Sequence, residues 1–125
     1  MKYIIFILFQ VIFILSNAQQ NNKVFVIEGI KIISPKTNNP NEIIFADFVL
    51  NNQSNQSVSI IEIRPNCHCT VPLYPKNPIK KGVKIKIRLQ TTAGQLKEIK
   101  QVDAVIKTSD PTNRFLKIQI VYGEH

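Results

Sequence analysis

Apolar residues recur at every second position along several short segments of this chain, a pattern that predicts β-strands with one buried face. The clearest segment is residues 83–89, where apolar and basic residues alternate without a break. Residues 43–50, 101–107 and 116–122 follow the same period, and residues 23–33 and 58–64 are rich in β-branched side chains. The residues expected to share a face within their strands are Ile44, Ala46, Phe48 and Leu50; Val83, Ile85, Ile87 and Leu89; Val102, Ala104 and Ile106; and Leu116, Ile118, Ile120 and Tyr122.

The strands follow one another at short spacing, and polar or turn-forming residues such as those in 34–40 and 51–57 separate them. No segment predicts a helix of respectable length. We therefore expect an all-β fold, an immunoglobulin-like antiparallel β-sandwich of about seven strands. A small closed barrel is the alternative, because strand spacing does not show whether two sheets face each other or one closes on itself. A length of 125 residues allows one packed domain and no second.

The N-terminal residues 1–18 have the three parts of a secretory signal peptide. A cationic start precedes an apolar run over 3–15, and the small residues Ser16 and Ala18 lie where cleavage requires them. A membrane anchor is the alternative, but the run is shorter than the roughly 20 residues that span a bilayer. We therefore expect residues 19–125 to be exported as one domain, to the periplasm, the cell surface or the medium, in an oxidising setting.

The short motif Cys67-His68-Cys69 is the candidate site for chemistry. Two thiolates on one side of the chain could hold Cu(I) or Zn(II), and His68 would join them only if the backbone turned. A disulfide between Cys67 and Cys69 is the second interpretation, and a turn would help it, because extended residues two apart place their Cα atoms about 6.6 to 6.8 Å from each other. The third interpretation is that both cysteines only pack as small apolar side chains.

Sixteen Lys and Arg residues against eight Asp and Glu give a formal net charge of +8. The basic residues concentrate in a stripe made of Lys76, Lys80, Lys81, Lys84, Lys86 and Arg88. Nucleic acid is a poor partner for this stripe, because single-strand binding interleaves aromatic platforms with the positive groove. One interpretation is a solvated strand face that blunts edge pairing, and the other is a surface for an acidic polysaccharide, lipid headgroups or a partner protein.

The sequence lacks the common motifs of enzymes. It contains no Gly-rich phosphate loop, no paired-carboxylate motif and no Ser-centred elbow. A nucleophilic cysteine needs a base within hydrogen-bond reach, and in a strand His68 would point away from both cysteines. We therefore expect a protein that is not an enzyme and that holds no cofactor.

The order of these features resembles a bacterial family of exported modules, domain-of-unknown-function family 1573. The resemblance covers residues 43–122, and its most specific element is a Cys-Xaa-Cys-Thr motif. The matching residues are Phe45 and Phe48, Asn51-Asn52, the strand 58–64, Cys67-His68-Cys69-Thr70, Lys80-Lys81-Gly82, the strand 83–89, Gly94 with Lys97, and the segment 116–123. The sequence departs from the family pattern where His68 replaces a glycine, Lys81 a proline and Leu96 an aromatic residue. The resemblance implies an immunoglobulin-like, hydin-related fold and an exported location, and no activity.

Two functional hypotheses follow from these observations. The first is a non-enzymatic exported module with a protein-interaction or structural role in the cell envelope, whose partner is another envelope or secreted protein. The second is a copper, zinc or thiol redox module in which Cys67, His68 and Cys69 do the work.

Overall fold

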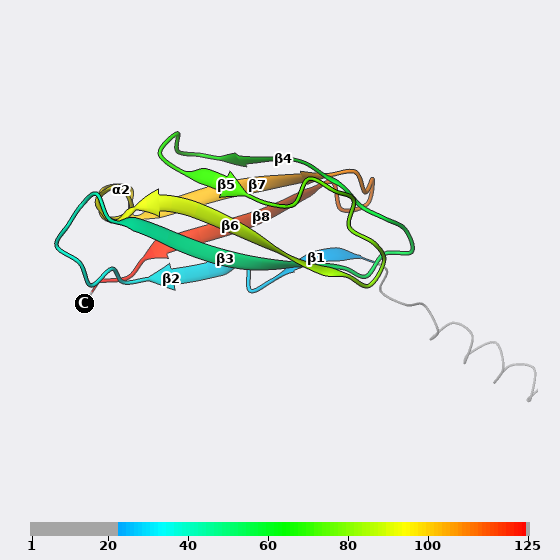
Figure 1. The fold of residues 1–125 in the computed structure, drawn as a ribbon, viewed down its shortest axis with the longest axis horizontal. Coiled ribbons are helices and arrows are strands. Elements are labelled where there is room, and N and C mark those ends of the chain that lie inside the picture. Colours follow the sequence, from blue (N-terminus) through cyan, green and yellow to red (C-terminus); the bar gives the residue numbers. More distant parts are fainter. Residues whose placement is uncertain (1–22, 125) are drawn as a thin grey trace, which may run out of the picture.

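Two four-stranded sheets pack face to face in the computed structural model, which describes residues 23–124 (Figure 1). Sheet A contains, in spatial order, β1 (Val24–Ile27), β3 (Ile43–Asn52), β6 (Lys84–Thr92) and β5 (Val71–Leu73). Sheet B contains β2 (Ile30–Ile33), β8 (Phe115–Tyr122), β7 (Gln101–Thr108) and β4 (Ile60–Pro65). Neighbouring strands are antiparallel except β2 and β8, which are parallel. The expected β-sandwich is confirmed, and the two separate sheets distinguish it from a closed barrel.

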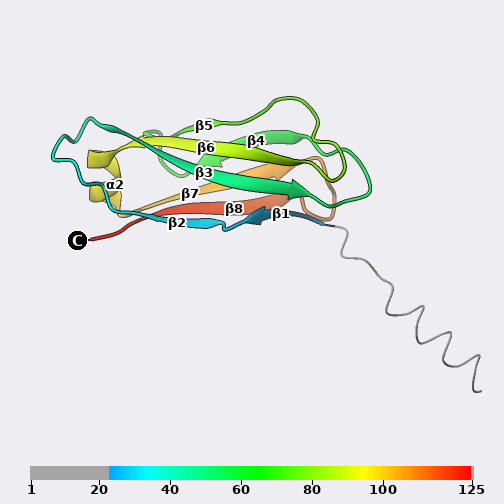
Figure 2. The ribbon, with the colours of Figure 1, turned by 60° about the horizontal axis from the view of Figure 1, so that its bottom comes forward.

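The core lies between the sheets, where long strands β3 and β6 lie over β7 and β8 (Figure 2). The expected inward faces are confirmed, since the alternating apolar residues of these strands are buried: Ala46, Phe48, Leu50, Ile87, Leu89, Val102, Ala104, Ile106, Ile118 and Ile120. Val83 differs from the expectation. It precedes β6 and is 40% exposed, because its backbone still belongs to the turn before the strand.

The expected single strand over residues 23–33 is two strands in the structure. β1 pairs with β3 in sheet A, and β2 pairs with β8 in sheet B. The change of sheet occurs at Glu28, whose φ of 53° lies in the left-handed region, and at Gly29. A Cβ at Gly29 would lie 3.3 Å from the Lys117 carbonyl oxygen, so glycine allows the chain to approach β8 closely here. This switch divides one predicted segment into two strands, and the three-residue β5, which the sequence does not predict, brings the described strands to eight.

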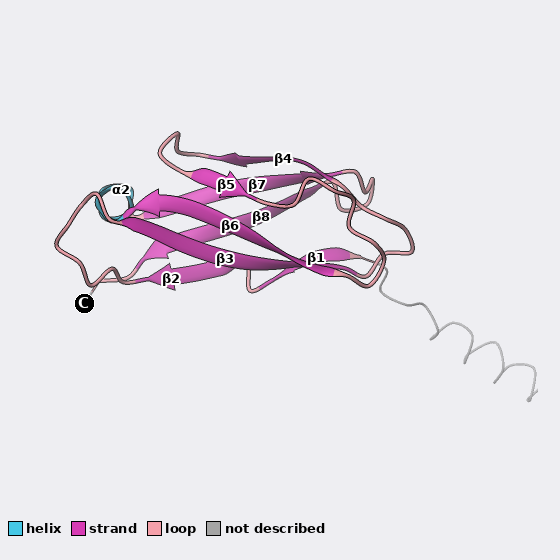
Figure 3. Ribbon diagram, in the orientation of Figure 1, coloured by secondary structure: helices cyan, strands magenta, loops and turns pink. Residues whose placement is uncertain are grey.

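One short helix, α2 (Ala93–Ile99), lies between β6 and β7 at one end of the sandwich (Figure 3). The Thr92 hydroxyl accepts from the Gln95 N–H at its start, and Lys100 ends the helix in the left-handed conformation. Leu96 is fully buried, so the helix closes this end of the core. The sequence predicts no helix of respectable length, and α2, which has seven residues, was not anticipated. In the part of the chain described, no helix is long or apolar enough to span a bilayer.

The signal peptide expected at residues 1–18 lies outside the described residues and stays a prediction. The assignment of residues 19–125 to one exported domain stays a prediction as well. Within residues 23–124, all strands belong to the two sheets of one sandwich.

Candidate functional site

The cysteine motif forms a turn that carries the chain from β4 in sheet B to β5 in sheet A. Cys67 and Cys69 are joined by a disulfide, which is one of the alternatives that the sequence leaves open, and their Cα atoms are 5.2 Å apart. The backbone turns here, because the Thr70 N–H donates to the Cys67 carbonyl oxygen at 3.2 Å. This turn shortens the Cα separation from the value of about 6.6 Å for extended residues two apart.

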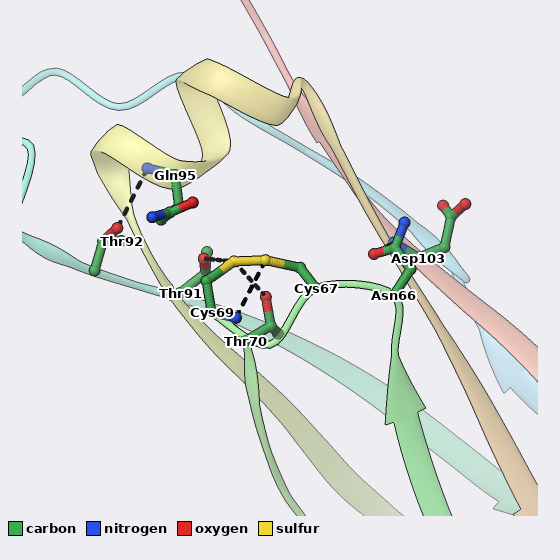
Figure 4. The surroundings of a disulfide bond; sticks show 8 residues. All are labelled: Asn66, Cys67, Cys69, Thr70, Thr91, Thr92, Gln95 and Asp103. Atoms are coloured by element: carbon green, nitrogen blue, oxygen red, sulfur yellow. Dashed lines mark hydrogen bonds between the residues drawn. A yellow bond between two sulfur atoms is a disulfide. The ribbon is translucent and has the colours of Figure 1, made fainter.

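Two buried threonines contact the disulfide (Figure 4). The Thr91 hydroxyl donates to Cys69 Sγ at 3.9 Å, and the Thr70 hydroxyl lies 3.7 Å from the same sulfur. Both cysteines are half-buried, whereas His68 between them is exposed. One side of the turn therefore packs on polar groups of the protein, and the His68 side faces solvent.

Asn66 fixes the beginning of this turn to the neighbouring strand β7. Its N–H donates to the Asp103 carbonyl oxygen at 2.8 Å, and its side-chain Oδ1 accepts from the Asp103 N–H at 3.1 Å. Such a pair of hydrogen bonds continues the β4–β7 ladder by one residue through a side chain. The disulfide turn is thus held at one end by sheet B.

The structure does not group Cys67, His68 and Cys69 as metal ligands. Among residues 23–124, no three or more His, Cys, Asp or Glu side chains are arranged to hold a metal ion. A sulfur in a disulfide is not a thiolate, the form that binds Cu(I) or Zn(II). Metal binding at this turn therefore requires reduction of the disulfide and stays a prediction.

The replacement of the family's glycine by His68 carries no backbone strain. Among the non-glycine residues described, positive φ occurs at Glu28 and Lys100 and not at His68. The freedom of glycine is therefore not required in this turn.

A second candidate site is the outer face of sheet A. Four apolar side chains there are between 46% and 50% exposed, and we call them the sheet A patch: Ile43, Phe45, Val71 and Leu73. The strand register brings them together, because Gln90 of β6 pairs with Phe45 on one side and with Val71 on the other. Arg88, one row along β6, pairs with Leu73. The four apolar side chains thus come from β3 and β5 and flank Gln90 and Arg88 of β6, near the end of the sheet that carries α2.

An ion pair lies beside this patch. Arg88 Nε donates to Asp47 Oδ1 at 2.7 Å, and its NH2 group donates to Oδ2 at 3.1 Å. The Arg88 guanidinium also lies 4.8 Å from the centroid of the Phe45 ring. These hydrogen bonds from Arg88 hold the pKa of Asp47 below its ordinary value. The pair is therefore fully ionised at neutral pH, and its two charges cancel locally.

The basic stripe expected from the sequence divides between a strand and a loop. Lys84 and Lys86 are exposed on the outer side of β6, next to Arg88. Lys76, Lys80 and Lys81 lie in the loop before β6, and Lys76 Nζ is 3.4 Å from the centroid of the Tyr74 ring.

Asn52 positions this loop, a role that neither the polar segment 51–57 nor the match of Asn51-Asn52 to the family pattern predicts. Its side chain is fully buried. Its Nδ2 donates to the carbonyl oxygens of Gln56 at 3.0 Å and Ile79 at 2.9 Å, and its Oδ1 accepts from the Ser54 N–H at 3.1 Å and hydroxyl at 2.6 Å. The Gly82 N–H donates to the Asn52 carbonyl oxygen at 2.7 Å. One asparagine thus joins the end of β3 to the loops before β4 and β6.

A surface hollow of about 340 Å³ lies beside α2 and carries little that could do chemistry. Its lining is formed by Pro35, Thr37, Asn38, Asn39, Pro40, Ala93, Gly94, Lys97 and Tyr122. This set holds no carboxylate, histidine or cysteine, and the groups in it that could take part in acid-base or nucleophilic chemistry are Thr37, Lys97 and Tyr122.

A family model matches most of the chain. The family described as "Protein of unknown function (DUF1573)" matches residues 32–121. The chain belongs to this family. The match confirms the family resemblance, while its immunoglobulin-like, hydin-related detail stays a prediction.

Two solved structures share the fold. A protein of unknown function from Porphyromonas gingivalis W83 is 12% identical, with a TM-score of 0.64 over 85% of this chain and 50% of the other. The secreted serine protease VesC from Vibrio cholerae is 10% identical, with a TM-score of 0.54 over 84% of this chain and 24% of the other. This chain therefore spans half or less of the length of either protein, and at these identities the likeness shows the fold alone. No curated protein matches.

Proposed function

We propose that this DUF1573 chain is an exported, non-enzymatic β-sandwich module that binds another envelope or secreted protein. The observation that carries the proposal is the sheet A patch, where four large apolar side chains, two on β3 and two on β5, are about half exposed on either side of β6. Grouped apolar surface of this kind costs free energy in water and marks interaction sites, whereas single exposed apolar residues do not. The apolar and basic segment at residues 1–18 supports export.

The proposal is tested by site-specific photocrosslinking of the full chain in a bacterium that exports it. Phe45→p-benzoylphenylalanine places the crosslinker in the sheet A patch. Phe115→p-benzoylphenylalanine is the matched control, because Phe115 is also an exposed phenylalanine but lies on β8 of sheet B. We expect a discrete crosslinked protein from position 45 and a weaker one or none from position 115. A chain that stays monomeric and uncrosslinked at both positions would contradict the proposal.

A second candidate function is thiol redox chemistry at the Cys67–Cys69 disulfide. The observation that favours it is that the bond joins residues only two apart. Closing so short a loop contributes little chain-entropy stabilisation, so the fold does not depend on the bond as it does on a long-range bridge. A thiolate of a partner dithiol attacks one sulfur, and the other cysteine leaves as a thiolate that takes up a proton. The partner's second thiol, as a thiolate, then attacks the partner's own sulfur in the mixed disulfide, and the cysteine of this chain leaves as a thiolate that takes up a proton. This leaves the partner oxidised and both cysteines reduced.

This second function is tested by the intact mass of the chain purified from an exporting host without reductant or chelator. A mass two hydrogens below that of the dithiol form shows the disulfide. Redox exchange is supported if this mass difference persists on denaturation and disappears when the folded chain is treated with a dithiol reductant at the potential of exported oxidoreductases. Metal mass that disappears on denaturation, with both thiols free and with loss in Cys67→Ser, supports the copper or zinc alternative instead. A bond that resists the reductant while the chain is folded contradicts the redox function.

A further inference from the structure

We propose that the outer face of sheet A binds an extended segment of the partner that is apolar in one half and acidic in the other, laid along β6. The proposal rests on the proposed binding function and adds the surface, the orientation and the chemistry of the partner.

The face is divided into two halves along β6. Its second half has no net charge and is largely apolar, because the uncharged Gln90 is flanked by Phe45 and Val71, and the charge of Arg88 is cancelled by Asp47. Its first half is cationic. Lys84 and Lys86 are exposed there, and the contact that the structure shows for Lys86 is a long one, 3.9 Å from Nζ to Asp47 Oδ2. The loop that leads into β6 adds exposed Lys80 and Lys81.

The spacing of the cations fits an extended chain. Lys84 and Lys86 are two residues apart on one strand, so their side chains leave the sheet about 6.6 to 6.8 Å from each other along β6. The side chains on one side of any extended peptide repeat at the same distance. Two acidic residues separated by one residue can therefore meet both lysines, while apolar residues further along the same segment lie over the sheet A patch.

Charge complementarity argues against a second copy of this chain as the occupant. The carboxylate on this face beside β6, Asp47, is already bound through both oxygens by Arg88. A second copy would therefore bring lysines to the lysines of the first and no free carboxylate. The face of sheet B is different, because its charges pair with one another: Lys117 Nζ lies 3.9 Å from Asp103 Oδ2, and Arg64 pairs with Glu62.

The test measures binding of a defined probe to the full exported chain labelled with ¹⁵N. The probe is a fluorescent ten-residue peptide with valine or leucine at alternate positions of one half, glutamate at alternate positions of the other, and threonine between. A second peptide with lysine in place of each glutamate is its control. We expect amide shifts on β3, β6 and β5 with the acidic peptide only, and binding that weakens as salt is raised.

Matched charge reversals locate the site. We expect Lys84→Glu with Lys86→Glu to weaken binding of the acidic peptide about tenfold or more, and Phe45→Ala to weaken it by a similar factor. Lys36→Glu with Arg114→Glu gives the same net charge at exposed positions outside sheet A, and we expect less than a twofold change from it. Thermal unfolding of each variant by circular dichroism verifies that it folds.

Three outcomes would overturn the inference. In the first, the acidic peptide shifts amide signals of sheet B or shifts none. In the second, the chain binds phosphatidylglycerol vesicles and does not bind the acidic peptide. In the third, the chain dimerises through the sheet A patch as its concentration rises. The photocrosslinking described above separates this failure from failure of the binding function. A partner captured through another surface leaves the proposed function standing, whereas capture of no partner contradicts both.

Discussion

Replacing Asn52 by alanine tests whether one buried side chain holds the loop that leads into the cationic half of β6. The four hydrogen bonds of the Asn52 side chain join the end of β3 to Ser54, Gln56 and Ile79. Alanine removes all four bonds. It also leaves a space too small for water to satisfy every partner, since the side chain is fully buried.

The expected cost follows from how well each partner can be rehydrated. The Gln56 carbonyl is only partly buried, so water can replace its lost bond at a net cost of about 1 kcal/mol. The Ile79 carbonyl is buried but still accepts from the Val58 N–H at 2.9 Å, so losing the Asn52 donor costs about 1 kcal/mol there as well. The Ser54 N–H loses its acceptor in a buried position, at a cost of about 1 to 2 kcal/mol. We therefore expect Asn52→Ala to lower the free energy of unfolding by about 3 to 4 kcal/mol.

The assay is urea denaturation followed by circular dichroism, with Asn55→Ala as the control. Asn55 lies in the same loop and is exposed, so its replacement is expected to cost less than about 0.5 kcal/mol. A cost below about 1 kcal/mol for Asn52→Ala would refute the reasoning, because the loop would then not depend on this side chain. A loss of about 3 to 4 kcal/mol in the free energy of unfolding, with an unchanged dependence of this free energy on urea concentration, would support the reasoning.

Three further predictions concern stability. Cys67→Ser with Cys69→Ser should cost about 1.6 kcal/mol, the chain entropy of a loop of three residues, and a loss above about 4 kcal/mol in denaturant would contradict this. Leu96→Ala should cost about 2 to 5 kcal/mol by the same assay, because the side chain is fully buried where α2 closes the core. Asp47→Asn should reduce the dependence of the free energy of unfolding on pH at acidic pH. The depressed pKa of Asp47 stabilises the fold above its unfolded value of about 3.9, and this stability disappears as the pH falls through the folded pKa.

The strands of the core could be predicted because each buries one face. In β7, for example, Val102, Ala104 and Ile106 are all fully buried, and their period of two is visible in the sequence without any knowledge of partners. Burial forces the period on the sequence, so the period indicates burial. The same argument could not separate β1 from β2, since both halves of residues 23–33 are apolar and only Gly29 marks the change of sheet.

The short helix was missed for a different reason. Seven residues give too few turns for a helical period to appear, and Gly94 within them lowers helix propensity. The available signal was local. Thr92 followed three residues later by Gln95 has the spacing of a capping box, and the structure shows the Gln95 N–H bonded to the Thr92 hydroxyl at 3.3 Å.

The sheet A patch could not be predicted from the sequence, because it depends on the register between strands. Phe45 and Val71 are far apart in the chain and meet only through Gln90 of β6. Nothing within either strand indicates which neighbour it takes. The disulfide, by contrast, lies within three consecutive residues, and so the motif itself raised it as an alternative.

The edge strand β5 links the two candidate sites. It begins one residue after Thr70, it has three residues, and it carries Val71 and Leu73, two members of the sheet A patch. Its central Pro72 has no N–H to donate, so few ladder hydrogen bonds fix its register against β6. The disulfide turn, held to β7 at its other end, therefore limits where β5 starts. Reduction of the disulfide would therefore weaken partner contacts at Val71 and Leu73 simply by releasing β5. Loss of partner binding on reduction is evidence for redox chemistry only if the contacts at Phe45, which lies across β6 from β5, are lost as well.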